Sequence, residues 1–177
     1  MTPAETIAIL QGTFGSAILA AKSDALDPFV VVEPAKLVEV CTFLRDDPRL
    51  KFDLLNDMTG VDYLEPDAKK AAKAGFEPHV EVVYHLSSFS RPGSRFTLKV
   101  ILPRWKGDVA GELPEVPTVS GVWPTADWHE REAFDLVGVK FLGHPDPRRI
   151  LLSDDWVGHP LRKDYEFPLE YHDIRCR

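Results

Sequence analysis

Two runs of alternating side chains constrain the fold of this 177-residue chain more than any other feature. Over residues 80–85 and 96–102, apolar residues occupy every second position. Successive side chains of a strand point to opposite faces, so each run is typical of a strand with one buried face. Arg91-Pro92-Gly93 lies between the runs and is typical of a turn. The pattern predicts an antiparallel hairpin.

The residues before this hairpin predict two helices and two further strands. Pro34 is typical of a helix start, and apolar residues then recur every three or four positions. We expect, in chain order, a short helix at 3–11, a buried strand at 29–32, an amphipathic helix from Pro34 to before Pro48, a strand at 52–64 with Gly60 as a candidate bulge, and an exposed loop at 65–77.

The residues after the hairpin predict one more helix and then a segment without regular structure. Pro124 and Gly138 bracket a helix, because proline favours the first turn and glycine the C-terminal cap. Residues 104–122 read as a loop with at most a short strand at 116–119, and 139–142 suit another strand. Four prolines leave little room for regular structure further on: Pro145, Pro147, Pro160 and Pro168.

These elements predict an α+β fold in which helices pack on a mixed β-sheet, with an extended proline-rich C-terminal arm. At 177 residues with 44% hydrophobic content, the chain is long enough for one core and short for two. We divide it into a core domain at 1–142, which includes the helix expected at 124–137, and an extended arm at 143–177 that we expect to dock on a partner.

The composition argues against several classes of function. A net charge of −7 disfavours nucleic-acid binding, which needs clustered lysine and arginine. Cys41 and Cys176 stand far apart without a CxxC motif, so this chain alone offers no ligand set for an iron–sulfur cluster or a structural zinc. Both are expected to be reduced thiols. No GxGxxG, P-loop or GxSxG motif occurs, and we predict no catalytic, cofactor-binding or metal-binding residue.

The sequence predicts no membrane anchor. Residues 1–10 lack the basic start and long apolar run of a secretory signal. The longest apolar runs, such as 29–32, are far shorter than the roughly 20 residues of a spanning helix. We therefore expect membrane contact only through another protein of a larger complex.

Glu130 lies among apolar residues on the predicted helix 124–137. A helical wheel places five of them on its face: Trp123, Ala126, Ala133, Phe134 and Val137. A buried carboxylate is costly unless it pairs with a cation or accepts hydrogen bonds from several donors. We expect Glu130 to pair with Arg148 or Arg149, which follow the helix after a short return; Arg131 points elsewhere.

The opposite face of this helix combines large apolar side chains with acids: Trp128, Glu132, Asp135 and Leu136. An isolated surface helix rarely exposes such a combination. We expect this face to meet a partner protein. The alternative is that the C-terminal arm folds back, with Trp156 or Leu161 covering Trp128.

Two Gly-His-Pro sequences, at 143–145 and 158–160, predict rigid turns. His144 and His159 lack the spacing of metal ligands, so we expect their rings to cap backbone groups or to reach a partner. The next charges, in 162–164, lie in a segment too rich in proline to build a core. We expect them to dock on a partner. Their removal should then leave the isolated fold intact.

The order of these motifs is itself informative. It comprises Glu130-Arg131-Glu132, Asp135-Leu136-Val137, His144, Arg148-Arg149-Ile150-Leu151 and Gly158-His159-Pro160-Leu161-Arg162-Lys163-Asp164-Tyr165. The array resembles the signature of the 30 kDa subunit of respiratory NADH:quinone oxidoreductase, complex I. Before about residue 121, only the length and the order of the expected elements resemble the family.

The resemblance implies a cofactor-free structural subunit in the peripheral arm of a proton-translocating complex. Its partners would be the 49 kDa-like subunit, the small cluster-bearing subunit and other peripheral-arm subunits, which would hold FMN, iron–sulfur clusters and quinone. Its place would be the cytoplasmic side of the bacterial inner membrane, where it would support electron transfer from NADH to quinone. The residues implied to bind or brace partners are Trp128, Glu130, Arg131, Glu132, Asp135, His144, Arg148, Arg149, His159, Arg162, Lys163, Asp164 and Tyr165.

Two other interpretations stay open. Related subunits occur in membrane-bound hydrogenases and other quinone-linked dehydrogenase complexes, and the signature does not separate them cleanly. A stand-alone enzyme would use the histidines and carboxylates of the signature. Glu130 and Glu132 lie two positions apart on a helix and point in different directions, which disfavours that enzyme.

Overall fold

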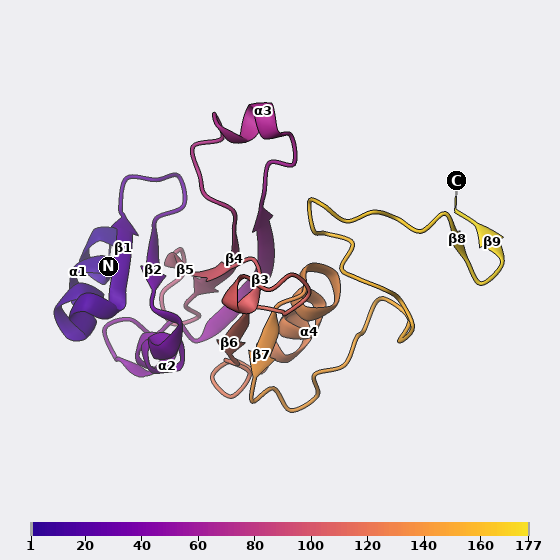
Figure 1. The fold of residues 1–177 in the computed structure, drawn as a ribbon. Coiled ribbons are helices and arrows are strands. Elements are labelled where there is room, and N and C mark those ends of the chain that lie inside the picture. The colour runs from indigo at the N-terminus through magenta and orange to yellow at the C-terminus, as the bar shows by residue number, and fades with distance from the viewer. Residues whose placement is uncertain (1, 177) are drawn as a thin grey trace.

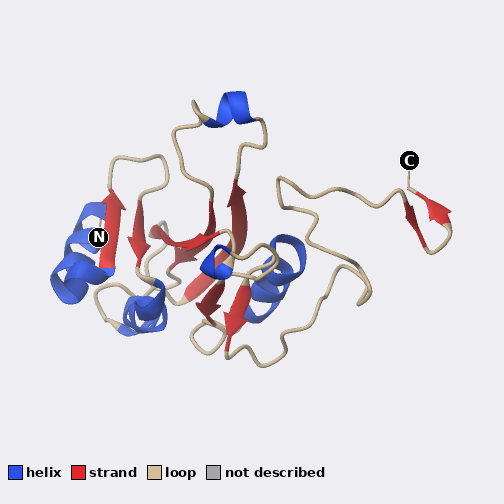
Figure 2. Ribbon diagram, in the orientation of Figure 1, coloured by secondary structure: helices blue, strands red, loops and turns tan. Residues whose placement is uncertain are grey.

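A five-stranded mixed sheet forms the body of the fold (Figures 1 and 2). The computed structural model describes residues 2–176. β2 and β5 run parallel, and the other neighbouring strands run antiparallel. In spatial order the strands are β1 (Ile18–Lys22), β2 (Phe29–Val32), β5 (Arg95–Pro103), β4 (His79–Ser87) and β3 (Leu54–Tyr63). The predicted α+β class with a mixed sheet is confirmed.

The predicted hairpin is the pair β4 and β5. It is in register from the pair His79 and Pro103 to the pair Ser87 and Arg95. Alternate side chains of β4 enter the core, where Val80, Val82 and Tyr84 are fully buried. Glu81 and Val83, on the other face, are also buried, so the period of two identifies the strand and its more deeply buried face.

The helices begin and end close to where the sequence predicts. α1 (Pro3–Phe14) starts at a capping box, in which Thr2 and Glu5 bond each other's backbone N–H groups. After the 3₁₀ turn η2 (Pro34–Lys36), α2 (Leu37–Asp46) buries its apolar stripe in the core. The remaining helical segments are η1 (Gly15–Ala17), α3 (Ala68–Ala71), η3 (Lys106–Asp108) and α4 (Ala126–Val137).

Three features differ from the predictions. β1 was not expected, because a short edge strand with four exposed residues carries no periodic signal. The bulge of β3 lies between Leu55 and Asp57, so the assignment to Gly60 is wrong. Gly60 instead permits close packing, since a Cβ atom there would lie 3.2 Å from Val137 of α4. α3 adds one short helix to the loop expected at 65–77.

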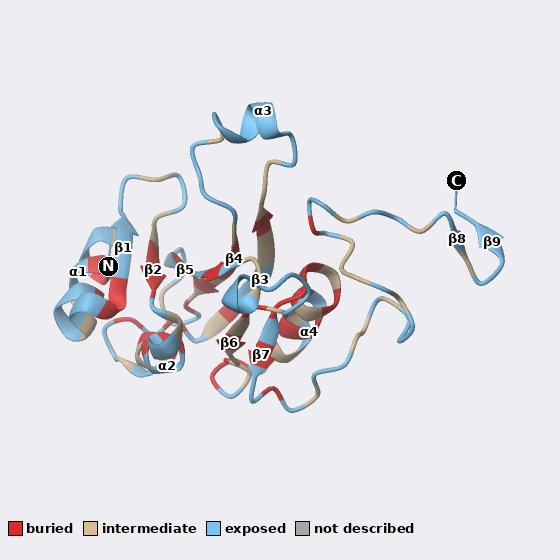
Figure 3. Cartoon of the chain, viewed as in Figure 1, coloured by how far each residue is buried: buried red, intermediate tan, exposed pale blue. Residues whose placement is uncertain are grey.

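The last part of the chain departs from the sheet. β6 (Glu115–Pro117) and β7 (Lys140–Leu142) form a parallel pair near α4. Beyond β7, the only regular elements among the described residues are β8 (Glu170–Tyr171) and β9 (Ile174–Arg175), which pair as a hairpin. Most of this segment is exposed (Figure 3). Its first half nevertheless returns to α4, and the contacts made there define the site.

Candidate functional site

Helix α4 ends at a glycine that the local geometry requires. Gly138 has φ of 76°, and its N–H bonds the carbonyls of Ala133 (3.0 Å) and Phe134 (3.1 Å). A Cβ atom at this position would also lie 2.5 Å from the ring of His159. Glycine therefore serves both the left-handed conformation and the close approach of the returning chain.

Asp135 of α4 anchors the returning chain. One carboxylate oxygen accepts hydrogen bonds from three successive backbone N–H groups, those of Ile150 (3.1 Å), Leu151 (2.8 Å) and Leu152 (2.9 Å). The other accepts from the guanidinium of Arg149 at 2.7 Å. Burial acts to raise the pKa of Asp135, but these four donors outweigh it and hold the pKa below its ordinary value.

The position of Asp135 corrects the prediction from the helical wheel. The wheel placed Asp135 beside Trp128 on an exposed face, whereas its side chain is fully buried. A wheel describes one helix alone, and here residues 149–152 cover α4 at Asp135. Asp135, and not Glu130, is the carboxylate that pairs with Arg149.

Glu130 is buried as predicted, but its partners are not arginines. Its carboxylate accepts hydrogen bonds from the Thr118 hydroxyl and from the backbone N–H of Val119 at 2.7 Å. The expected pair with Arg148 or Arg149 is therefore wrong; two donors from the upstream turn satisfy the carboxylate instead. Because desolvation outweighs these two bonds, the pKa of Glu130 rises to about 7.

The histidines of both Gly-His-Pro turns form hydrogen bonds with backbone groups, which is the first of their two predicted roles. His144 Nδ1 accepts from the N–H of Asp146 at 3.0 Å, which leaves Nε2 to donate to the carbonyl of Asp127 at 3.1 Å. His159 Nδ1 donates to the carbonyl of Asp135 at 2.9 Å. Desolvation lowers the pKa of His159, so its ring is neutral near pH 7.

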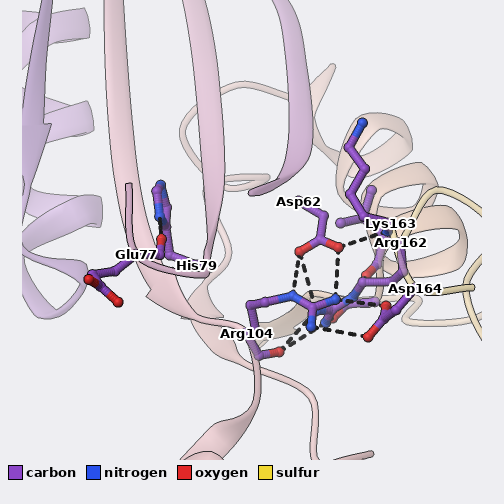
Figure 4. Close-up of polar contacts among 9 residues, drawn as sticks. Asp62, Glu77, His79, Arg104, Arg162, Lys163 and Asp164 are labelled. Carbon is purple, nitrogen blue, oxygen red and sulfur yellow. Dashed lines mark hydrogen bonds and ion pairs between the residues drawn. The ribbon is translucent and has the colours of Figure 1, made fainter. Parts of the chain in front are cut away.

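Arg162 is buried against the end of α4 (Figure 4). Its guanidinium donates to the carbonyls of Val137 (2.6 Å), Gly138 (3.2 Å) and Arg104 (3.1 Å). The guanidinium also stacks 4.3 Å from the ring centre of Trp105. Desolvation lowers the pKa of Arg162 from its ordinary value. A cation that bonds the last carbonyls of a helix stabilises the helix end.

Asp62, at the end of β3, links the same segment to the sheet. Its carboxylate is paired with Arg104 through two hydrogen bonds of 2.7 and 2.8 Å. It also accepts the backbone N–H of Lys163 at 2.9 Å. Arg104 donates in turn to Asp164 at 2.8 Å, and that contact lowers the pKa of Asp164. The four residues form one network across three parts of the chain (Figure 4).

This network engages two of the three charges of residues 162–164 within the chain. Arg162 is buried and bonds carbonyls of this chain, whereas Asp164 pairs with Arg104 and keeps a side chain that is 45% exposed. The side chain of Lys163 is exposed. Docking of this segment on a partner stays a prediction. Proline density suggested that the segment has no core of its own, and hydrogen bonds from Arg162 and Lys163 tie it to α4 and β3. Tyr165 follows, and its hydroxyl donates to the carbonyl of Val157 at 3.3 Å.

Arg131 and Arg148 lie at the side of α4. Arg131 is buried, donates to the carbonyl of Arg148 at 3.3 Å, and has its guanidinium 5.1 Å from the ring centre of Trp128. The Arg148 side chain faces solvent and pairs with Asp146 at 2.9 Å. Arg148 is thus placed where solvent or another molecule can reach it.

The outer face of α4 is open around Trp128. This side chain is 64% exposed, and Glu132, one turn further on, is also exposed. The alternative in which Trp156 or Leu161 covers Trp128 is therefore wrong. Further large apolar side chains are exposed along the arm: Leu151, Val157, Leu161, Phe167, Leu169 and Ile174. We call Trp128 and these six residues the exposed apolar surface.

Asp62, Arg104 and Thr118 are site residues that the sequence did not reveal. Asp62 lies 101 positions before the Lys163 N–H whose hydrogen bond it accepts, and no motif marks Asp62. Thr118 and Glu130 are 12 positions apart on different elements. The local sequence around these residues does not indicate such pairings, because the pairings depend on how the strands and α4 are placed in the fold.

The described residues contain neither a metal-binding cluster nor a membrane-spanning helix. Within 2–176, no group of three or more His, Cys, Asp and Glu side chains is arranged to hold a metal ion. In the same part of the chain, no helix is both long enough and apolar enough to cross a membrane.

Comparisons with known proteins agree on one family. The family model for the 30 kDa subunit of respiratory-chain NADH dehydrogenase matches residues 30–171. The C subunit of NADH-quinone oxidoreductase from Roseiflexus sp. (strain RS-1) is 46% identical over 155 residues, which cover 88% of this chain and 79% of the relative. The same subunit of Geotalea uraniireducens (strain Rf4) is 41% identical over 93% of this chain and 87% of the relative.

The fold gives the same answer. A solved structure of Nqo5, described as the trypsin-resistant fragment (1-134), has a TM-score of 0.60 and 28% sequence identity, and the match covers 80% of this chain and 98% of that one. The fold and the site thus define a subunit of a respiratory-chain NADH dehydrogenase. Within that class, the chain belongs to the family of the 30 kDa subunit, which is the C subunit of the bacterial NADH-quinone oxidoreductases.

Proposed function

We propose that this chain is a cofactor-free structural subunit in the peripheral arm of complex I. One observation carries the proposal: the ionisable groups buried in the 123–165 segment bond this chain's own backbone and side chains. Bonds of this kind fix the shape of the segment, because each buried charge would be costly without its partner. A fixed shape is what a scaffold for other subunits requires.

The exposed apolar surface supports the assembly role. Large apolar side chains at Trp128, Val157 and Leu169 are 64, 85 and 71% exposed. An array of this kind on a chain of net charge −7 fits burial against other proteins. We propose that the arm at 143–177 docks on the 49 kDa-like subunit, near the small cluster-bearing subunit. FMN, iron–sulfur clusters and quinone would then belong to those partners, on the cytoplasmic side of the bacterial inner membrane.

The related alternatives are less well supported. The relatives compared above are named as subunits of NADH-quinone oxidoreductase, which favours complex I over a membrane-bound hydrogenase. An enzyme active site would need its acids and histidines free to meet a substrate. Glu130, Asp135 and His159 are instead engaged in hydrogen bonds inside the chain.

The identity of co-purifying proteins tests the proposal. The tagged chain is extracted from membranes in a mild detergent, and its companions are identified by mass spectrometry. We expect the 49 kDa-like and cluster-bearing subunits in equal amounts with this chain, together with NADH-dependent quinone reduction. A chain that purifies alone, or with hydrogenase subunits, contradicts the proposal.

A further inference from the structure

An open groove of about 570 Å³ lies between Trp105 and the stretch from Asp155 to Tyr171. Four aromatic side chains contribute to its walls: Trp105, Trp156, Tyr165 and Tyr171. The rings of Trp156 and Tyr171 are 4.9 Å apart, so the start and end of the stretch are held together. The groove lies outside the buried Asp135 and Glu130 sites.

Acidic residues dominate the charged groups along this groove. Asp155, Asp164, Glu166 and Glu170 line it, and Arg162 is its only arginine or lysine among the described residues. Arg162 already donates to three backbone carbonyls. Within residues 2–176, neither Glu166 nor Glu170 forms an ion pair, so both carboxylates are available to a cation.

Asp155 keeps its charge at the edge of the groove. It accepts a hydrogen bond from the Tyr171 hydroxyl and another from His172, both at 2.7 Å. The Tyr171 contact, followed by that of His172, holds the pKa of Asp155 well below its ordinary value. Aromatic faces beside carboxylates attract cations through both the ring quadrupole and the ionic charge.

The wall of the groove also carries an unused donor. The indole N–H of Trp156 is buried and has no acceptor among the described residues. An anionic lipid surface or a nucleic acid would be repelled by the acids that line the groove.

We propose that this groove holds an extended basic segment of a neighbouring subunit, with an arginine or lysine seated between the aromatic walls and the acidic residues. This inference rests on the proposed place of the chain in complex I. It adds the chemistry of one contact: charge complementarity to Glu166 and Glu170, with apolar contact to Val157 and Trp156.

Cross-linking in the assembled complex tests this. A photoreactive benzoylphenylalanine replaces Val157, which is 85% exposed in the groove, and in a control it replaces Val109, which is 57% exposed outside it. We expect the probe at 157 to capture a segment of another subunit that contains arginine or lysine. Adding Glu166→Gln and Glu170→Gln should lower that yield about fivefold or more, as expected for loss of complementary charge. The control yield should not change.

The possible outcomes separate the two claims. Capture of lipid, of a second copy of this chain or of a segment without basic residues overturns the groove assignment, as does no capture or an unchanged yield in the double variant. If the complex is intact while any of these occurs, the proposed function stands and only the groove assignment fails. If the chain does not co-purify with the complex at all, both fail together.

Discussion

Replacing Glu130 by glutamine should change how stability depends on pH. The carboxyl has a pKa of about 7 in the folded chain against 4.5 for an ordinary glutamate. Between these values the unfolded chain has released a proton that the folded chain still holds, so stability falls as pH rises through this window. At about 1.4 kcal/mol per pKa unit, the full penalty above pH 7 is about 3 kcal/mol.

The hydrogen bonds around Glu130 allow the substitution. The glutamine carbonyl can accept from the N–H of Val119, as the carboxylate does at 2.7 Å. Its amide can donate to the Thr118 oxygen, whose hydroxyl then donates to Ser120, 2.8 Å away. No arginine pairs with Glu130, and His144 Nε2, 3.8 Å from the carboxylate, donates to the carbonyl of Asp127, so the variant leaves neither group without a partner. Glu130→Gln should therefore gain about 2.5 kcal/mol relative to the parent between pH 5 and pH 8.

Urea unfolding, followed by tryptophan fluorescence, measures this difference. The free energy of unfolding is compared for the parent and Glu130→Gln at pH 5, 6, 7 and 8. Glu132→Gln, on the exposed side of the same helix, is the control and should track the parent. A Glu130→Gln variant that loses stability relative to the parent as pH rises would refute the reasoning, because that is the behaviour of a carboxylate paired with a cation.

Further changes give contrasting results in the same unfolding assay. Asp135→Asn should cost about 3–5 kcal/mol of stability at pH 7, because it weakens a buried ionic cluster. This cost should shrink in acid, where the parent carboxylate takes up a proton below its lowered pKa. A cost that grows in acid would contradict this. Arg162→Ala should cost a similar 3–5 kcal/mol or so by uncapping α4, whereas Lys163→Ala should stay within about 0.5 kcal/mol; equal effects would place Arg162 at the surface. Gly138→Ala should cost about 1–3 kcal/mol of stability, since φ is 76° and the His159 ring occupies the space for a Cβ atom. Gly12→Ala, within α1, has open space and should gain about 0.5–1 kcal/mol of stability. A harmless Gly138→Ala would mean that the returning chain is not held against α4.

Much of the core could be predicted because its signals are local. The period of two in β4 lies within 9 consecutive residues, and the helical spacing of α2 lies within 10. Helical spacing in α4 likewise predicted that Glu130 is buried, as the structure shows. It did not show what satisfies the carboxylate, because a cation and a pair of donors both meet that need.

The site was harder to predict because its contacts join distant parts of the chain. Asp135 looks solvent-facing on an isolated helix and is buried only when residues 149–152 fold over it. Arg162 lies in a proline-rich stretch, yet it reaches the carbonyls of Val137 and Arg104. In both cases the determining partner is a backbone group, and backbone groups carry no residue-specific signal in a sequence.

Activity per assembled complex tests the scaffold role most directly. Trp128→Ala with Leu161→Ala removes two large side chains from the exposed apolar surface, where they are 64 and 56% exposed. Native gels of membranes give the amount of assembled complex, and NADH-dependent quinone reduction is divided by that amount. A scaffold predicts less complex with an unchanged ratio. Full assembly with a lowered ratio would contradict the scaffold account and would give this chain a direct part in electron transfer.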